Sequence, residues 1–146
     1  MTMQLTDQFN RKINYMRISV TDRCDFRCIY CMSEQMNFLP KNQLLTLEEI
    51  NRIATIFISM GVEKIRITGG EPLVRKNVAT LFDKLSKNKD LKELTLTTNA
   101  SQLLKKAGML KASGIKRINI SLDSLNPLNF KKMTRTGAVS YTHLRA

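Results

Sequence analysis

The chain of 146 residues contains no tryptophan, one histidine and only three cysteines. Its longest apolar stretch, Ile53–Val62, is interrupted by Thr55 and Ser59 and falls far short of the roughly 18 residues that cross a bilayer. We therefore expect neither a membrane-spanning helix nor a membrane partner. Residues 1–12 are polar and lack the apolar segment of a secretory signal, so we expect a cytoplasmic location.

The three cysteines lie within eight residues, at Cys24, Cys28 and Cys31. An odd and local set cannot pair into the disulfide framework of an extracellular protein, so we expect these thiols to bind metal. Soft thiolates suit zinc or iron–sulfur clusters. A structural zinc site needs a fourth ligand, and the single histidine, His143, lies close to the end of the chain. Three cysteines on a four-iron cluster instead leave one iron open to an external ligand.

Basic residues outnumber acidic ones by 24 to 12, which gives a formal charge of +12 and an isoelectric point near 10.0. Such a balance suits nucleic acid, a membrane surface or an anionic small molecule as partner. The lysines are scattered over the expected solvent faces of helices, and no recognition helix or aromatic RNA-binding signature accompanies them. We expect no nucleic-acid partner. Arg17, Arg66 and Arg75 differ from the lysines because they adjoin segments that carry other functional signals.

Segments of β-forming residues alternate with amphipathic segments, in a composition typical of one globular domain. Strands are expected at 15–20, 64–68, 93–98 and 117–122, and helices at 46–59, 78–86, 101–112 and from Asn126 onward. Thr46 and Glu49 have the spacing of a capping box, and Ser101 is the expected N-cap of the third helix.

About four β/α units in succession predict an α/β protein with a parallel sheet and right-handed crossovers. Both an open doubly wound sheet and a β/α barrel are compatible with this pattern. In either fold the ligand site lies at the carboxyl ends of the strands. All three cysteines fall in the long connection 21–45, which directly follows the first strand.

A second motif, Thr-Gly-Gly-Glu-Pro, ends the second strand at Gly69, Gly70 and Glu71. Glycines at the end of a strand allow the backbone to approach a ligand closely, and the unpaired carbonyls there can accept hydrogen bonds from an ammonium group. A plain tight turn is the alternative interpretation of this motif.

The segment CDFRCIYC, with Tyr30 before the last cysteine, resembles the cysteine motif of the radical S-adenosylmethionine (SAM) enzymes. Four longer segments resemble the molybdenum cofactor biosynthesis protein A family of GTP 3′,8-cyclases within that class; they are RISVTDRCDFRCIYCM, KIRITGGEPLVR, LTLTTNA and RINISLDSL. The resemblance covers about residues 15–137. It implies the N-terminal part of a partial β/α barrel that binds a [4Fe-4S] cluster and SAM.

The resemblance also implies roles for individual residues. The cysteines would bind the cluster, and a further set would contact SAM: Tyr30, Gly69, Gly70, Glu71 and Ser121. Arg17, Arg66 and Thr97 match positions that contact GTP. No side chain need act as a catalytic acid or base, because the radical is generated at the cluster. An electron donor is an implied partner, and the intact protein could form a homodimer.

The chain departs from this family in length and at its end. Family members are more than twice as long and carry a second, C-terminal cysteine triplet for a second [4Fe-4S] cluster. We expect residues 1–137 to be the N-terminal part of a radical SAM core domain and 138–146 to be a non-native tail, so that this piece alone would be inactive. Another radical SAM activity and a non-catalytic iron–sulfur module are the alternative functions.

Overall fold

The computed structural model describes residues 4–137, which form one parallel sheet with helices. The strands are β1 (Tyr15–Ser19), β2 (Lys64–Thr68), β3 (Glu93–Thr98) and β4 (Arg117–Ile120). The helices are α1 (Leu47–Ser59), α2 (Val78–Ser86), α3 (Leu103–Ala112) and α4 (Pro127–Thr134), with short 3-10 turns at η1 (Lys41–Gln43) and η2 (Pro72–Val74). The expected tail, 138–146, and His143 lie outside the described residues.

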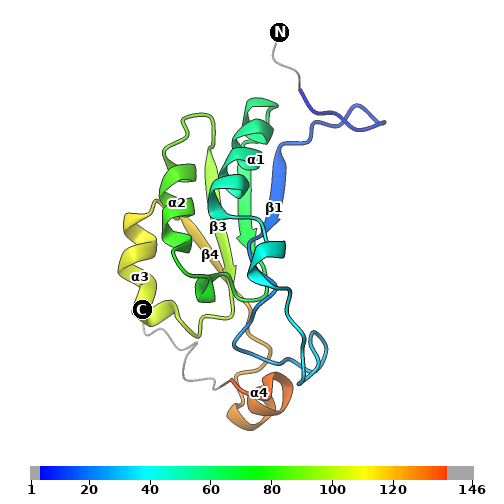
Figure 1. Cartoon of the computed structure of the whole chain (residues 1–146), viewed down its shortest axis with the longest axis vertical. Coiled ribbons are helices and arrows are strands. Elements are labelled where there is room, and N and C mark those ends of the chain that lie inside the picture. The colour runs from blue at the N-terminus through cyan, green and yellow to red at the C-terminus, as the bar shows by residue number, and fades with distance from the viewer. Residues whose placement is uncertain (1–3, 138–146) are drawn as a thin grey trace.

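The four strands pair in parallel in the order β1-β2-β3-β4, which is also their order along the chain. Figure 1 shows α1, α2 and α3 on the same side of this sheet. A doubly wound sheet reverses its strand order and places helices on both faces, whereas sequential strands with helices on one face are the winding of a β/α barrel. The parallel α/β fold is confirmed, and its winding is that of a barrel segment.

The expected elements are all present, with small differences at their ends. The Thr46–Glu49 capping box at the start of α1 is confirmed. Strands β1 and β4 are shorter than expected, although the next amides, those of Val20 and Ser121, still donate to neighbouring strand ends at 2.9 Å. No helix among residues 4–137 is long and apolar enough to cross a membrane.

Apolar and polar residues alternate along the strands, so the sheet has one apolar face and one polar face. The apolar side chains, such as Ile67 and Leu96, pack with α1, α2 and α3 into a single core. We call the other side the open face; it carries Tyr15, Arg17, Ser19, Lys64, Arg66, Thr68, Glu93, Thr95, Thr97, Arg117 and Asn119. In a barrel winding this polar face is the interior side, and a ligand site lies at its end where the carboxyl ends of the strands meet.

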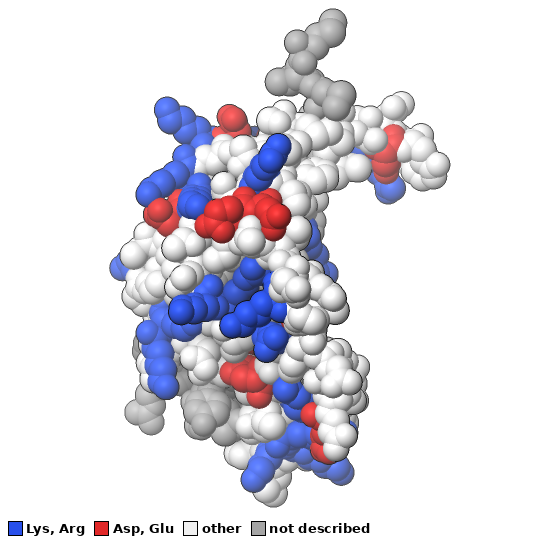
Figure 2. All heavy atoms as spheres, viewed as in Figure 1, with Lys and Arg blue, Asp and Glu red and all other residues white. Residues whose placement is uncertain are grey.

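The basic side chains on the helix-covered face form several separate groups with acidic side chains between them (Figure 2). Several are held in exposed ion pairs, for example Lys87 with Asp83 at 2.7 Å and Lys92 with Glu63 at 2.6 Å. Exposed pairs of this kind contribute little stability. They are consistent with a solvated surface for these lysines.

Candidate functional site

The connection from Thr21 to Leu45, which we call the cysteine loop, begins where β1 ends. A tight turn in it brings Cys28 and Cys31 together, because the Cys31 amide donates to the Cys28 carbonyl at 2.9 Å. Cys31 is exposed, whereas Cys24 and Cys28 are half-buried and pack against the aromatic pair of Phe26 and Phe130. The loop therefore presents its thiols at the edge of a small apolar cluster.

Burial controls the ionisation of the two inner thiols. It raises the pKa of Cys24 to about 11 and also raises the pKa of Cys28. The sulfur of Cys24 accepts a hydrogen bond from the Phe26 amide at 3.4 Å and lies 3.8 Å from the side-chain nitrogen of Asn99. Because a metal ligand must be the thiolate, binding iron here has to displace these protons, and the two N–H donors then stabilise the resulting charge on Cys24.

The three thiols are soft donors of the kind that iron–sulfur clusters use. Among residues 4–137, no three His, Cys, Asp or Glu side chains converge closely enough to hold one metal ion. In a four-iron cluster each cysteine binds a different iron, so the sulfurs stand further apart than the ligands of a mononuclear site. Three thiols without a fourth match a cluster that has one open iron.

The Gly-Gly-Glu turn packs directly against the cysteine loop. The Gly70 amide donates to the Thr21 carbonyl at 2.7 Å, and the Glu71 amide donates to the Arg23 carbonyl at 2.8 Å. A Cβ at Gly69 would lie 2.7 Å from the Thr21 carbonyl oxygen, and one at Gly70 would collide with the Arg23 carbonyl. In the structure the cysteine loop itself excludes a side chain at both positions. The close approach of a ligand to these glycines, which the sequence interpretation expects, stays a prediction.

The carboxylate of Glu71 is fully buried and joins the end of β2 to the end of β3. One oxygen accepts from the Leu73 amide at 3.0 Å and from the Thr98 hydroxyl at 2.8 Å, and the other accepts from the Asn99 amide at 2.7 Å. Burial raises the pKa of Glu71, and these three hydrogen bonds oppose that rise. Both oxygens are thus used within the chain, which makes Glu71 a support of the loop ends.

We expect Glu71→Gln to lower the free energy of unfolding by about 1–3 kcal/mol, because glutamine keeps only one carbonyl oxygen for two opposed backbone amides and leaves a buried donor unpaired. Urea unfolding would measure the change. The matched control is Glu48→Gln, since Glu48 is exposed in a weak pair with Lys84 and should change stability by less than about 0.5 kcal/mol. Equal effects of the two variants would contradict the supporting role of Glu71.

The loop after β3 is tied to the cysteine loop through Asp25. The side-chain nitrogen of Asn99 donates to Asp25 at 2.8 Å, and the Ser101 hydroxyl donates to the other oxygen of that carboxylate. Ser101 is therefore not the N-cap of α3, which starts at Leu103 after Gln102 without a side-chain cap. Ala100 adopts a left-handed conformation, with φ of 65°.

At the end of β4 the chain also meets the cysteine loop. The Tyr30 hydroxyl donates to both carboxylate oxygens of Asp123, each at 2.9 Å. Burial, followed by this hydrogen bond, raises the pKa of Tyr30. Ser121, at the start of this connection, is exposed, and its amide donates to the Thr98 carbonyl at 2.9 Å. The expected SAM-contacting residues thus gather at one end of the sheet.

Helix α4 supports the cysteine loop, a role that the sequence interpretation missed. The rings of Phe26 and Phe130 meet edge to face with centroids 5.9 Å apart. The amides of Arg27 and Ile29 donate to the carbonyls of Thr134 and Met133 at 3.1 and 2.9 Å. The signal available in the sequence was the i, i+4 pair Phe130 and Thr134, the two buried positions of a short helix.

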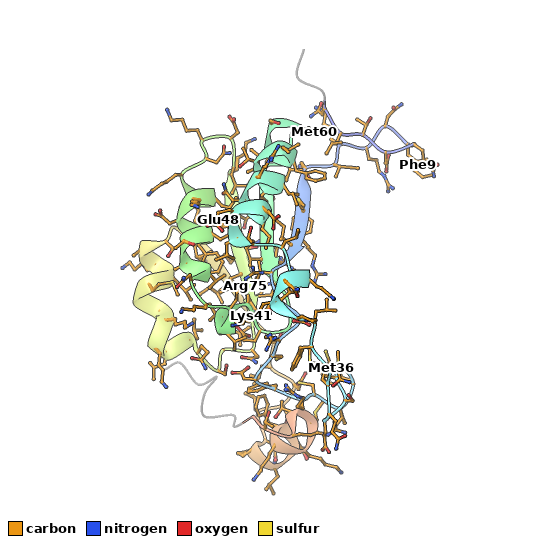
Figure 3. All side chains as sticks on the ribbon, viewed as in Figure 1. Phe9, Met36, Lys41, Glu48, Met60 and Arg75 are labelled. Atoms are coloured by element: carbon orange, nitrogen blue, oxygen red, sulfur yellow. The ribbon has the colours of Figure 1, made fainter. Side chains whose placement is uncertain are left out.

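The three arginines singled out in the sequence lie in two different places. Arg17 and Arg66 are register partners on the open face. Arg75 lies elsewhere, near the centre of Figure 3, where its guanidinium donates to the carbonyls of Val20 and Leu45. Arg75 therefore joins the two ends of the long loop, and only Arg17 and Arg66 share a surface.

The charges on the open face are unevenly compensated. Glu93 accepts from Arg117 at 2.8 Å and lies 3.8 Å from the Lys64 ammonium. Within residues 4–137, no carboxylate lies within salt-bridge distance of Arg17 or Arg66. Thr97, the third expected GTP contact, is the register partner of Asn119 and lies nearer the carboxyl ends of the strands. Lys64 and Arg117 thus share one carboxylate, whereas Arg17 and Arg66 have no acidic partner among the described residues.

A protein-family model described as the Radical SAM superfamily matches residues 18–144. The chain belongs to the radical SAM superfamily. Membership implies a [4Fe-4S] cluster and SAM as cofactors, in agreement with the three-thiol donor set. The fold is similar to that of a solved structure, Streptococcus suis SuiB bound to the precursor peptide SuiA, with a TM-score of 0.71 at 23% identity, over 88% of this chain and 28% of that one.

Curated relatives of this radical SAM chain are much more similar. A protein of Nitrobacter winogradskyi named GTP 3′,8-cyclase is 58% identical over 139 residues, which are 93% of this chain and 40% of the relative. A protein of the same name from Brucella ovis is 57% identical over 142 residues, which are 95% of this chain and 41% of the relative. The chain thus spans about 40% of the length of the curated relatives it matches.

Proposed function

We propose that this chain is the N-terminal part of a radical SAM enzyme that converts GTP to (8S)-3′,8-cyclo-7,8-dihydroguanosine 5′-triphosphate in molybdenum cofactor biosynthesis. The observation that carries the proposal is the pair of uncompensated arginines, Arg17 and Arg66, on the open face of the sheet. Guanidinium groups bind phosphate oxygens through planar, charge-assisted pairs of hydrogen bonds. The name of the relatives that match at 57–58% identity agrees with this substrate.

We assign the residues at the strand ends to cofactor binding. Cys24, Cys28 and Cys31 hold the cluster, and the edge formed by Gly69, Gly70 and Ser121, together with Tyr30, holds SAM. When bound, the cluster and SAM would supply the radical that removes hydrogen from the substrate. The cofactors would thus perform the difficult chemistry, while the protein binds and orients them. The buried carboxylate of Glu71 acts from beneath, where it keeps the glycine edge and the loop after β3 in fixed relative positions.

Arg17, Arg66 and Thr97 bind and orient the nucleotide in this proposal. The two guanidiniums hold the triphosphate, and Thr97 lies nearer the carboxyl ends, on the side of the sheet edge where the cofactors bind. No acid or base in the described residues is needed for this binding step. In this proposal an external one-electron donor is a partner of the intact protein, which also forms a homodimer. A second cluster and the remaining substrate contacts belong to the part of that protein beyond this chain. The native sequence beyond Gly137 tests this directly, since the proposal requires a second cysteine triplet there.

Removing either arginine is expected to weaken GTP binding by the intact protein about 10- to 150-fold, because a hydrogen-bonded charged contact contributes about 1.5–3 kcal/mol. Calorimetric titration with GTP would compare Arg17→Ala and Arg66→Ala with Arg52→Ala, an exposed arginine on α1. Unchanged affinity in both open-face variants would argue against GTP and favour a different radical SAM substrate. A loss of affinity in Arg52→Ala of the same size would indicate a nonspecific charge effect.

A further inference from the structure

Arg66 is a half-buried cation that the described part of the chain leaves without an acidic partner. Its Nε lies buried and has no hydrogen-bond partner among residues 4–137. A desolvated guanidinium costs free energy unless a ligand or a neighbour compensates it. Its charged end lies over an aromatic ring, with Cζ of Arg66 5.7 Å from the ring centroid of Tyr15.

The sheet register explains this contact. Tyr15 pairs with Lys64, and Arg17 pairs with Arg66, so Tyr15 and Arg66 are diagonal neighbours on the same face of adjacent parallel strands. Such diagonal positions are within reach of aromatic and long side chains. Tyr15 is 41% exposed on that face, so its ring forms part of the surface that a ligand would meet.

The open face restrains its cations in two different ways. Glu93 holds Arg117 through a 2.8 Å ion pair, which neutralises the charge and occupies N–H donors. An aromatic ring attracts a cation through its quadrupole, so Tyr15 can restrain Arg66 while leaving it positively charged and without an oxygen acceptor. A guanidinium that is held in this way keeps its donors for a phosphate.

We infer that Tyr15 is a positioning residue for Arg66, and that its ring orients the guanidinium toward the phosphate groups of the nucleotide substrate. The inference rests on the proposed function for its ligand. Tyr15 itself makes no hydrogen bond to the substrate in this arrangement; it acts through Arg66. The ring is the required part of the side chain, and its hydroxyl is dispensable.

The test is GTP binding by the intact protein and its variants, measured by calorimetric titration. Tyr15→Leu is expected to weaken GTP binding about two- to fivefold, the range set by a partly exposed cation–π contact, and Tyr15→Phe should bind as the wild type does. In an Arg66→Ala background, Tyr15→Leu should have no further effect. In an Arg17→Ala background it should still weaken binding, because Arg66 remains.

The control variant is Phe9→Leu, which removes a similar contact, with Arg11 Cζ 5.3 Å from the ring centroid. Phe9 projects from the N-terminal segment, away from the sheet (Figure 3), so GTP binding should not change. An equal loss from Tyr15→Leu with and without Arg66 would identify a merely structural role and overturn the inference. A loss in Tyr15→Phe as large as in Tyr15→Leu would overturn it as well.

Failure of the proposed function gives a different result. If the wild type does not bind GTP, or if Arg66→Ala binds it normally, Arg66 does not bind the nucleotide. Tyr15 then has no role in nucleotide binding either. If Arg66→Ala binds weakly while Tyr15→Leu binds normally, GTP remains the ligand and only the positioning role of Tyr15 is wrong.

Discussion

In this 146-residue chain, which has three cysteines, replacing Cys28 with alanine is expected to reduce the iron bound after anaerobic reconstitution from about four per chain to background. A four-iron cluster held by three cysteines already has one iron without a protein ligand, so the loss of another thiolate leaves only two attachments. The Cys24→Ala and Cys31→Ala variants should behave in the same way. Iron analysis together with the visible absorption of the reconstituted protein would measure the loss.

Ser33→Ala is the matched control for this experiment, because Ser33 is an exposed small residue in the same loop. It should retain the iron of the wild type. Iron that is retained in full by any of the three cysteine variants would show that this thiol is not a ligand. Adding SAM to the reconstituted wild type should also change its spectrum, since the open iron can accept an external ligand. An unchanged spectrum would favour a non-catalytic iron–sulfur module.

The sequence predicted those parts of the fold that depend on neighbouring residues. Two such signals extend over only a few residues each. One is the capping box of Thr46 and Glu49, and the other is the alternation of apolar and polar residues along the strands. Strand order requires contacts across the chain, so the strand and helix pattern alone left open the choice between a doubly wound sheet and a barrel, and only the family resemblance implied a partial barrel. The sequential order with helices on one face resolved it.

The site was predictable as a set of motifs but not as a network. Ser101 fits the preference of serine for N-caps, yet its hydroxyl donates to Asp25, 76 positions earlier. Gly70 fits a ligand-binding turn, yet the Arg23 carbonyl is what excludes a side chain there. In each case the contacting residue, Asp25 or Arg23, belongs to the cysteine loop, which follows the end of another strand, β1. Local preferences cannot reveal such partners, because parallel strands bring their carboxyl ends together only in the folded sheet.

Phe130 is another such distant partner, because it packs against Phe26 of the cysteine loop. Its loss should strongly affect the apolar cluster on which Cys24 and Cys28 lie. Phe130→Ala is expected to lower the free energy of unfolding by about 3–5 kcal/mol, because the ring is fully buried against Phe26 and its removal leaves a cavity. Leu128→Ala is the matched control on the same helix, since Leu128 is 80% exposed. Chemical unfolding would measure both variants.

Phe130→Ala should also slow iron loading of the chain, whereas Leu128→Ala should not. The ring packs against Phe26, and Cys24 and Cys28 pack against this aromatic pair. Without the Phe130 ring, the loop loses part of the apolar base that restricts the positions of its two inner thiols. Phe130→Leu, which restores much of the apolar volume that alanine removes, should recover part of both stability and loading. If Phe130→Ala unfolds at a much lower denaturant concentration yet loads iron at the wild-type rate under folding conditions, α4 stabilises the fold without ordering the cysteine loop. If both properties fall together and recover together, the packing of α4 is what holds the thiols ready for the cluster.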